Sequence, residues 1–196
     1  MISKLFKANA APSSKITRQR DLFYAVSALN HLRWQLATET MLPESYLHWL
    51  QHTGSLTARL EQSAQQLSLE LLTEGWQPAA DNVSDVRIRQ VLLCDGLRPW
   101  IWGLTEVTDE QLQQESELLN WLDKPLGHLL FAEASCIARS FELADFSENT
   151  EFCQILSKWG CPARKPLWGR RCALQYRSCQ LRLTEVFLPD HPMYGV

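Results

Sequence analysis

The sequence predicts an α+β fold, a single domain in which an antiparallel sheet of roughly six strands is covered on one face by helices. Three observations support this prediction. The length of 196 residues suits one domain. Strand-like alternation dominates the chain after about residue 68, and the recognisable turns join strands that are neighbours in sequence. Pairing between sequence neighbours indicates an antiparallel sheet, because parallel strands need long crossover connections.

The expected helices stand mainly at the start and in the middle of the chain. Apolar residues recur at helical spacing from Asp21 to about Thr40. Ser55 is a suitable N-cap, and Thr108 with Gln111 forms a capping-box pattern. The expected helices and helical turns cover residues 21–40, 45–51, 56–66, 109–122 and 127–131, with a further short helix within 147–168.

The expected strands are bounded by turn residues. Asp95 and Gly96 between two apolar runs are typical of a hairpin turn, and a second hairpin is expected to turn at 178–180. Pro189 ends the last strand, because proline cannot donate to a sheet. The expected strands cover residues 68–77, 86–94, 99–107, 137–143, 171–177 and 181–188.

Composition argues against several classes of function. A net charge of −3 gives no reason to expect a nucleic-acid partner. No apolar run approaches the roughly 18 residues of a membrane span. The six cysteines form no CxxC pair and have no histidine at metal-ligand spacing, so we expect thiols in the reducing cytoplasm. Residues 1–20 are basic and are expected to form a flexible tail before a domain covering 21–196.

Glu185 is the residue whose position most needs a chemical explanation. Side chains alternate along a strand, so Glu185 shares a face with Leu183 and Phe187. A carboxylate on an apolar face is ion-paired, hydrogen-bonded or protonated, and such groups gather at functional sites. Two interpretations stay open at this point: a structural ion pair or exposed edge strand, and the working group of an enzyme.

Arginines supply the candidate counter-charges. Arg89 shares strand parity with apolar residues, so it can pair with Glu185 or bind the carboxylate of a ligand. Arg87 has the same parity and is the alternative inward residue. Arg170 and Arg171 can attract an anionic substrate or be surface charges at the start of a strand.

Two histidines, His48 and His52, have the i, i+4 spacing that can bind a metal on one helix face. No acidic residue completes a metalloprotease motif beside them, so a solvated helix face is the preferred interpretation. Motifs for a nucleophile elbow, a P-loop and a dinucleotide site are all missing from the sequence.

A set of residue blocks occurs in a specific order. They are 49–50 with 55–59, 89–94 with Pro99, Trp100 and Gly103, 124–127 with 130–131, 166–172 (PLWGRRC), 183–189 (LTEVFLP) and 192–194 (PMY). Together they cover roughly residues 45–194, and the chain resembles the chorismate pyruvate-lyase family. The resemblance implies an antiparallel sheet with helical flaps that close over a buried ligand site.

The resemblance also implies an activity. Family members convert chorismate to 4-hydroxybenzoate and pyruvate, the first step of the ubiquinone ring pathway, without a metal or cofactor. By this resemblance we expect a cytoplasmic lyase, monomeric, whose partners are its small-molecule substrate and product. The alternative is a non-catalytic domain of the same fold that binds an aromatic acid as an effector.

Site residues follow from the resemblance position by position. Arg89 is expected to bind the ring carboxylate, and Glu185 to act at the end of the ring that carries the hydroxyl and C4. Glu185 either accepts a hydrogen bond from the hydroxyl or helps to move the C4 proton. Backbone N–H groups of Leu56 and Leu126 are expected to contact the ligand. The chain departs from the family pattern at Leu56, often methionine, and at Leu104, arginine in some members.

Overall fold

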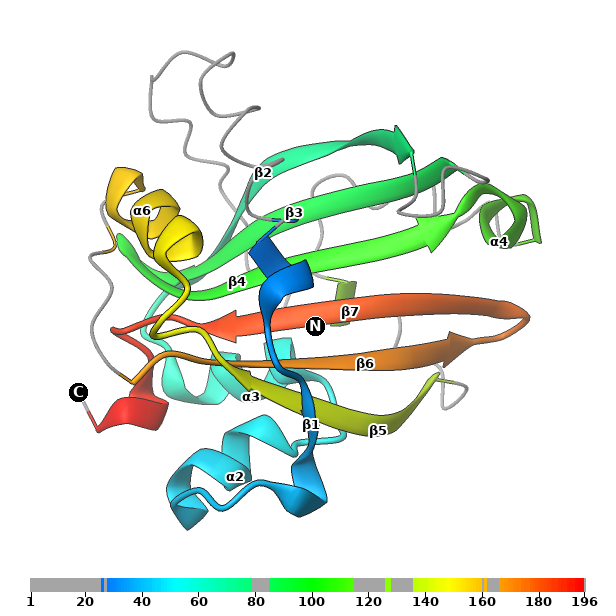
Figure 1. The fold of residues 1–196 in the computed structure, drawn as a ribbon. Coiled ribbons are helices and arrows are strands. Elements are labelled where there is room, and N and C mark those ends of the chain that lie inside the picture. Colours follow the sequence, from blue (N-terminus) through cyan, green and yellow to red (C-terminus); the bar gives the residue numbers. More distant parts are fainter. Residues whose placement is uncertain are drawn as a thin grey trace, which may run out of the picture.

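The computed structural model describes residues 26, 28–78, 85–114, 126–127, 136–159, 161 and 166–195. Within these residues, seven strands form one antiparallel sheet in the order β1-β5-β6-β7-β4-β3-β2 (Figure 1). The strands are β1 (Gln35–Leu36), β2 (Leu67–Pro78), β3 (Asp85–Asp95), β4 (Arg98–Thr108), β5 (Cys136–Asp145), β6 (Trp168–Tyr176) and β7 (Cys179–Phe187). The α+β class and the antiparallel sheet are therefore confirmed.

Six of these strands, β2 to β7, correspond to the six expected ones. Asp95 and Gly96 close the β3–β4 hairpin, and Gly96 adopts a φ of 61°, a left-handed conformation that glycine tolerates without strain. The β6–β7 hairpin turns at Arg177 and Ser178, one residue earlier than expected. Because register is counted from the turn, this difference changes which residues of β6 and β7 lie opposite one another.

The seventh strand, β1, overturns the prediction of a helix over residues 21–40 in its second half. There the chain forms a 3₁₀ turn (Leu29–His31), strand β1 and a second 3₁₀ turn (Ala37–Glu39). The backbone of β1 pairs with β5, and the Trp34 ring packs edge-on against Phe146 at 5.9 Å. Pairing at the sheet edge and partial burial of Trp34 outweigh the helical spacing of the leucines. Residues 21–25 and 27 lie outside the described residues.

Four α-helices lie within the described residues. They are α2 (Glu44–Leu50), α3 (Leu56–Ser63), α4 (Asp109–Gln114) and α6 (Thr150–Lys158). Ser55 caps α3 as predicted, since its Oγ accepts from Ala58 N at 3.1 Å. The capping box at α4 forms only in part. Thr108 Oγ1 accepts from Gln111 N at 3.4 Å, but Gln111 Oε1 accepts from Gln180 N instead.

The helices lie over both faces of the sheet, not over one as predicted. Apolar residues of α2 and α3 pack with Ile101 and Phe187, whereas those of α6 pack with their strand neighbours Trp102 and Val186. Adjacent strand residues point to opposite faces, so these are two separate cores. Figure 1 shows α6 in front of the sheet and α3 behind it. The face that carries α3 also carries the site.

No disulfide joins the five cysteines whose side chains the structure describes, Cys94, Cys153, Cys161, Cys172 and Cys179. In the same part of the chain, no helix is long and apolar enough to cross a membrane. The tail expected at residues 1–20 and the second half of the helix expected over 109–122 lie outside the described residues.

Candidate active site

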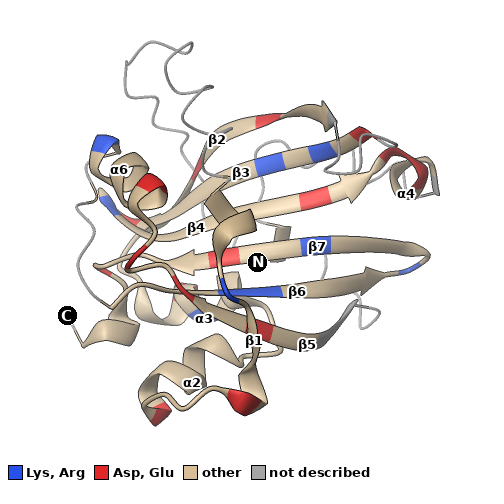
Figure 2. Ribbon diagram, viewed as in Figure 1, with Lys and Arg blue, Asp and Glu red and all other residues tan. Residues whose placement is uncertain are grey.

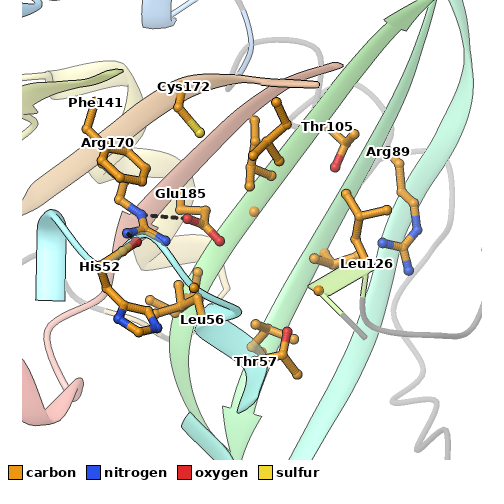
Figure 3. A pocket seen from close by; sticks show the side chains of 18 of the residues that line it. His52, Leu56, Thr57, Arg89, Thr105, Leu126, Phe141, Arg170, Cys172 and Glu185 are labelled. Atoms are coloured by element: carbon orange, nitrogen blue, oxygen red, sulfur yellow. Dashed lines mark hydrogen bonds and ion pairs between the residues drawn. The ribbon is translucent and has the colours of Figure 1, made fainter. Parts of the chain in front are cut away.

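A pocket lies between the sheet and the N-terminal end of α3 (Figure 3). It encloses about 670 Å³ of space, including its open mouth. Strands β2 to β7 form its floor, and α3 with Leu126 and Gly127 covers it. Most of the lining is apolar, with a few polar groups set into it, which is typical of a small-molecule site. The polar side chains of the lining are His52, Thr53, Thr57, Arg89, Thr105, Arg170, Cys172 and Glu185.

All four residues predicted for the site line this pocket: Leu56, Arg89, Leu126 and Glu185. Strand parity explains the two charged ones. Glu185 lies on the same face as Phe187, and Arg89 on the same face as Leu93, and both faces belong to the α3 side of the sheet. Figure 2 shows the charges on the ribbon, with basic residues on β3 and β6 and an acidic residue on β7 between them.

Arg89 is the inward arginine of β3. Its side chain lines the pocket at 5% exposure, and Thr105 of β4 lies directly opposite it in the sheet register. Arg87, two residues away on the same face, instead donates to Glu74 Oε1 at 2.6 Å and does not line the pocket. The alternative between Arg87 and Arg89, which parity left open, is therefore decided in favour of Arg89.

Glu185 is paired, but its partner is Arg170, not Arg89. Arg170 Nε donates to Glu185 Oε2 at 2.7 Å, and the two residues lie opposite each other on β6 and β7. Both side chains are almost fully buried. Figure 3 shows the second carboxylate oxygen of Glu185 directed into the pocket. Gly103 lies opposite Glu185 on the other side, in β4, and its lack of a side chain leaves space there.

Arg170 also binds the chain segment that leads into α3. Its Nη1 lies 3.3 Å from the carbonyl oxygens of Trp49 and Leu50, and 2.8 Å from that of His52. Its guanidinium stands over the Phe141 ring at 4.7 Å. The sequence analysis left Arg170 open between a substrate-attracting charge and a surface charge, and the structure makes it a buried part of the pocket. Counting outward from the correct hairpin turn would have placed it opposite Glu185.

Arg171, the next residue, lies on the opposite face. It forms two hydrogen bonds to Glu142 of β5, at 2.7 and 3.2 Å, and its guanidinium stands over the Trp34 ring at 4.4 Å. Leu104, one of the two departures from the family pattern, is also buried on that face, away from the pocket. The two consecutive arginines thus lie on opposite faces of the sheet, Arg170 in the pocket and Arg171 on the other side.

His52 lines the pocket and does not form the metal-binding pair with His48 that the i, i+4 spacing allowed. Helix α2 ends at Leu50, so His48 and His52 do not share a helix face. Burial lowers the pKa of His52 below its usual 6.5, and the neighbouring positive charges of Arg59 and Arg170 lower it further. The imidazole is therefore mainly neutral at pH 7. Within the described ranges, no group of three or more His, Cys, Asp or Glu residues is arranged to hold a metal ion.

The cover of the pocket depends on a close approach at Gly127. A Cβ on this residue would lie only 2.8 Å from the hydroxyl oxygens of both Ser55 and Thr57. Leu126 and Gly127 can therefore rest on the start of α3 because residue 127 has no side chain. Gly127 is helical, as expected for the start of the helical turn over 127–131, and Leu126 before it is helical too; residues 128–131 lie outside the described residues.

Comparison with known proteins agrees with the residue blocks found in the sequence. A family model described as chorismate lyase matches residues 28–195. A protein from Pectobacterium carotovorum named "Chorismate pyruvate-lyase" is 31% identical over 176 residues, which are 85% of this chain and 89% of that protein. A protein from Pseudoalteromonas atlantica named "Probable chorismate pyruvate-lyase" is 27% identical over 180 residues, 85% of this chain and 91% of that protein.

Among solved structures, the ligand-binding domain of a protein described as a GntR-family transcriptional regulator from Bordetella bronchiseptica is similar in part. The similarity covers 65% of this chain and 86% of that one, with a TM-score of 0.45 and 13% sequence identity.

Proposed function

The chain belongs to the chorismate lyase family, and we propose that it converts chorismate to 4-hydroxybenzoate and pyruvate in the pocket beneath α3. Arg89 binds the ring carboxylate, and Glu185 acts at the end of the ring that carries the hydroxyl and C4. The supporting observation is that Arg89 and Glu185, which come from opposite halves of the chain, line one buried pocket together with Leu56 and Leu126.

The residue types suit the chemistry. Chorismate is a dianion whose ring becomes aromatic when the enolpyruvyl group and the C4 hydrogen leave, so much of the driving force lies in the substrate. The protein then has to bind the substrate, orient its enolpyruvyl group and exclude water from the pocket. Arg89 can hold the ring carboxylate through two parallel hydrogen bonds, and its burial strengthens that interaction. Thr105, opposite Arg89, brings a hydroxyl to the same end of the pocket.

Glu185 is suited to the other end of the ring. Since Oε2 is bonded to Arg170, Oε1 is the oxygen that faces the ligand. It can accept the ring hydroxyl's hydrogen bond or help to move the C4 proton. The enolpyruvyl group leaves as pyruvate once its methylene carbon has gained a proton. Leu56 and Leu126, both almost fully buried, line the cover of the pocket, and in this proposal their backbone N–H groups contact the ligand.

By the same resemblance we place this reaction at the start of the ubiquinone ring pathway, in a cytoplasmic monomer that uses no metal or cofactor. A covered pocket that fits an aromatic product should release it slowly. We therefore expect 4-hydroxybenzoate to inhibit the enzyme.

A direct assay tests the proposal. Purified protein is mixed with chorismate, and 4-hydroxybenzoate and pyruvate are followed by chromatography against the spontaneous reaction. Formation of both products in equal amounts, faster than without protein, is the expected result. Binding of 4-hydroxybenzoate without turnover would contradict the lyase activity and favour an aromatic-acid-binding domain.

A further inference from the structure

Arg170 holds an unusual position in the pocket because it touches two separate parts of the chain. One side of its guanidinium meets the carboxylate of Glu185 on β7, and the other meets the carbonyl oxygens of residues 49, 50 and 52. Its side chain is 4% exposed. Such a buried charge must be balanced and hydrogen-bonded to be tolerated, and here both conditions are met within the site.

The contacts use the geometry of the guanidinium group. Arginine presents its donors in one rigid plane, so a bond at Nε fixes the direction of Nη1. The Phe141 ring under the guanidinium restricts it further. Moving the end of α2 would therefore move the group that holds Glu185, and the reverse is also true. The segment 49–52 leads through three residues into α3, whose Leu56 and Thr57 line the pocket.

We propose that Arg170 is the positioning residue of this site: it occupies Oε2 of Glu185 so that Oε1 faces the ligand, and it fixes the segment from which the α3 cover starts. The identity of the ligand rests on the proposed function. Arg170 itself touches no reacting atom in this proposal. Displacement of a catalytic group by about 1 Å can cost about a hundredfold in rate, so the orientation of Glu185 matters.

Arg171 supplies a matched control. It adjoins Arg170 in sequence and also donates through Nε to a glutamate at 2.7 Å, but on the opposite face. Arg170→Gln is expected to lower kcat about a hundredfold by the misplacement argument above, and Arg171→Gln to leave it within about twofold. Arg170→Lys keeps the charge but cannot hold the carboxylate and the carbonyls in one plane, so an intermediate loss is expected.

A second measurement separates positioning from general loss of structure. The compounds 4-hydroxybenzoate and benzoate differ only by the ring hydroxyl, which meets Glu185 in the proposed arrangement. The ratio of the affinity for 4-hydroxybenzoate to the affinity for benzoate therefore reports on Glu185. Loosening of α3 lowers both affinities together, whereas misorientation of Glu185 lowers their ratio. Arg170→Gln should bring the ratio of the two affinities toward one, and it should lower that ratio no further in a protein that already carries Glu185→Ala, which has no acceptor left to misorient.

The outcomes are distinct. If Arg170→Gln and Arg170→Lys keep the parent's kcat and affinity ratio, or if the losses from the Arg170 and Glu185 changes add in full, Arg170 does not position Glu185. A parent that binds 4-hydroxybenzoate without turning over chorismate contradicts the lyase activity alone, and the affinity ratio still tests Arg170. A parent that binds neither compound overturns both proposals.

Discussion

Two ion pairs on opposite faces of the sheet use nearly the same chemistry. Arg170 pairs with Glu185 beneath α3, and Arg171 pairs with Glu142 on the face that carries α6, both at 2.7 Å. The first pair is almost fully buried and its carboxylate faces a pocket, whereas the second is about one-third exposed. The comparison shows that burial and neighbours, not residue type, separate a candidate catalytic group from a surface ion pair.

The largest expected difference between the two pairs concerns their carboxylates. Glu185→Gln should lower turnover of chorismate by about a hundredfold or more, because an amide cannot take up the C4 proton and accepts a hydrogen bond from the ring hydroxyl less strongly than a carboxylate does. Glu142→Gln, on the other face, should keep the parent's rate. Steady-state kinetics of the two variants, with thermal unfolding as a check on folding, measures the difference. Equal rates in both variants would remove Glu185 from the chemistry.

The next contrast lies within β3. Arg89→Ala should weaken binding of 4-hydroxybenzoate by about 10- to 100-fold, since a hydrogen bond to a charged group contributes about 1.5–3 kcal/mol. Arg87→Ala removes an arginine of the same strand and face that pairs with Glu74 outside the pocket. The affinity of the Arg87→Ala variant for 4-hydroxybenzoate should match that of the parent. Isothermal titration of both variants gives the answer, and a reversed order would make Arg87 the ligand-binding residue.

A buried histidine gives the α3 face a pH dependence of its own. His191 is 0% exposed among the rings of Trp49, Trp100 and Phe187, and burial lowers its pKa from 6.5 to about 3. His191 binds a proton more tightly in the unfolded chain than in the folded one. Its contribution to the free energy of unfolding is therefore complete above pH 6.5 and is lost as the pH falls toward 3. At pH 5 the loss in the free energy of unfolding should be about 2 kcal/mol.

His191→Asn is the matched variant for this prediction. The imidazole Nδ1 accepts from Met193 N at 2.9 Å, and an asparagine oxygen can accept the same bond without titrating. Urea unfolding between pH 7.5 and 4 should therefore show a shallower fall for the variant than for the parent. Parallel curves would assign the acid sensitivity to other groups.

The smallest expected effect concerns the exposed pair. The hydrogen bond from Arg171 lowers the pKa of Glu142 below 4.5, so the pair stabilises the fold above that pH and the effect is lost as pH falls through the lowered value. Arg171→Gln should cost at most about 1 kcal/mol at pH 7, as for other exposed pairs. Denaturant unfolding at pH 7 and pH 3 checks this, and the difference from the parent should be smaller at the lower pH. A cost of several kcal/mol at pH 7 would make the two pairs alike.

Much of the fold could be predicted from the sequence because its signals are local. Alternation and the Asp95-Gly96 turn predicted β3 and β4, and Ser55 predicted the start of α3. The helix over residues 21–40 failed in its second half because pairing with β5 competes with helical spacing there. The distribution of helices over both faces could not be predicted. The alternation along a strand shows which residues share a face, but it does not say which helix covers that face.

The candidate site divides in the same way. The sequence by itself determined that Glu185 shares a face with Leu183 and Phe187, because alternation along a strand is a local property with a period of two. The family resemblance predicted that Arg89, Leu56 and Leu126 would join it. The tertiary structure alone decided that Arg170, which lies opposite Glu185 in the β6–β7 hairpin, also holds the carbonyls at the end of α2. The contacts to those carbonyls join segments more than a hundred residues apart, and no local pattern of one strand or hairpin encodes them.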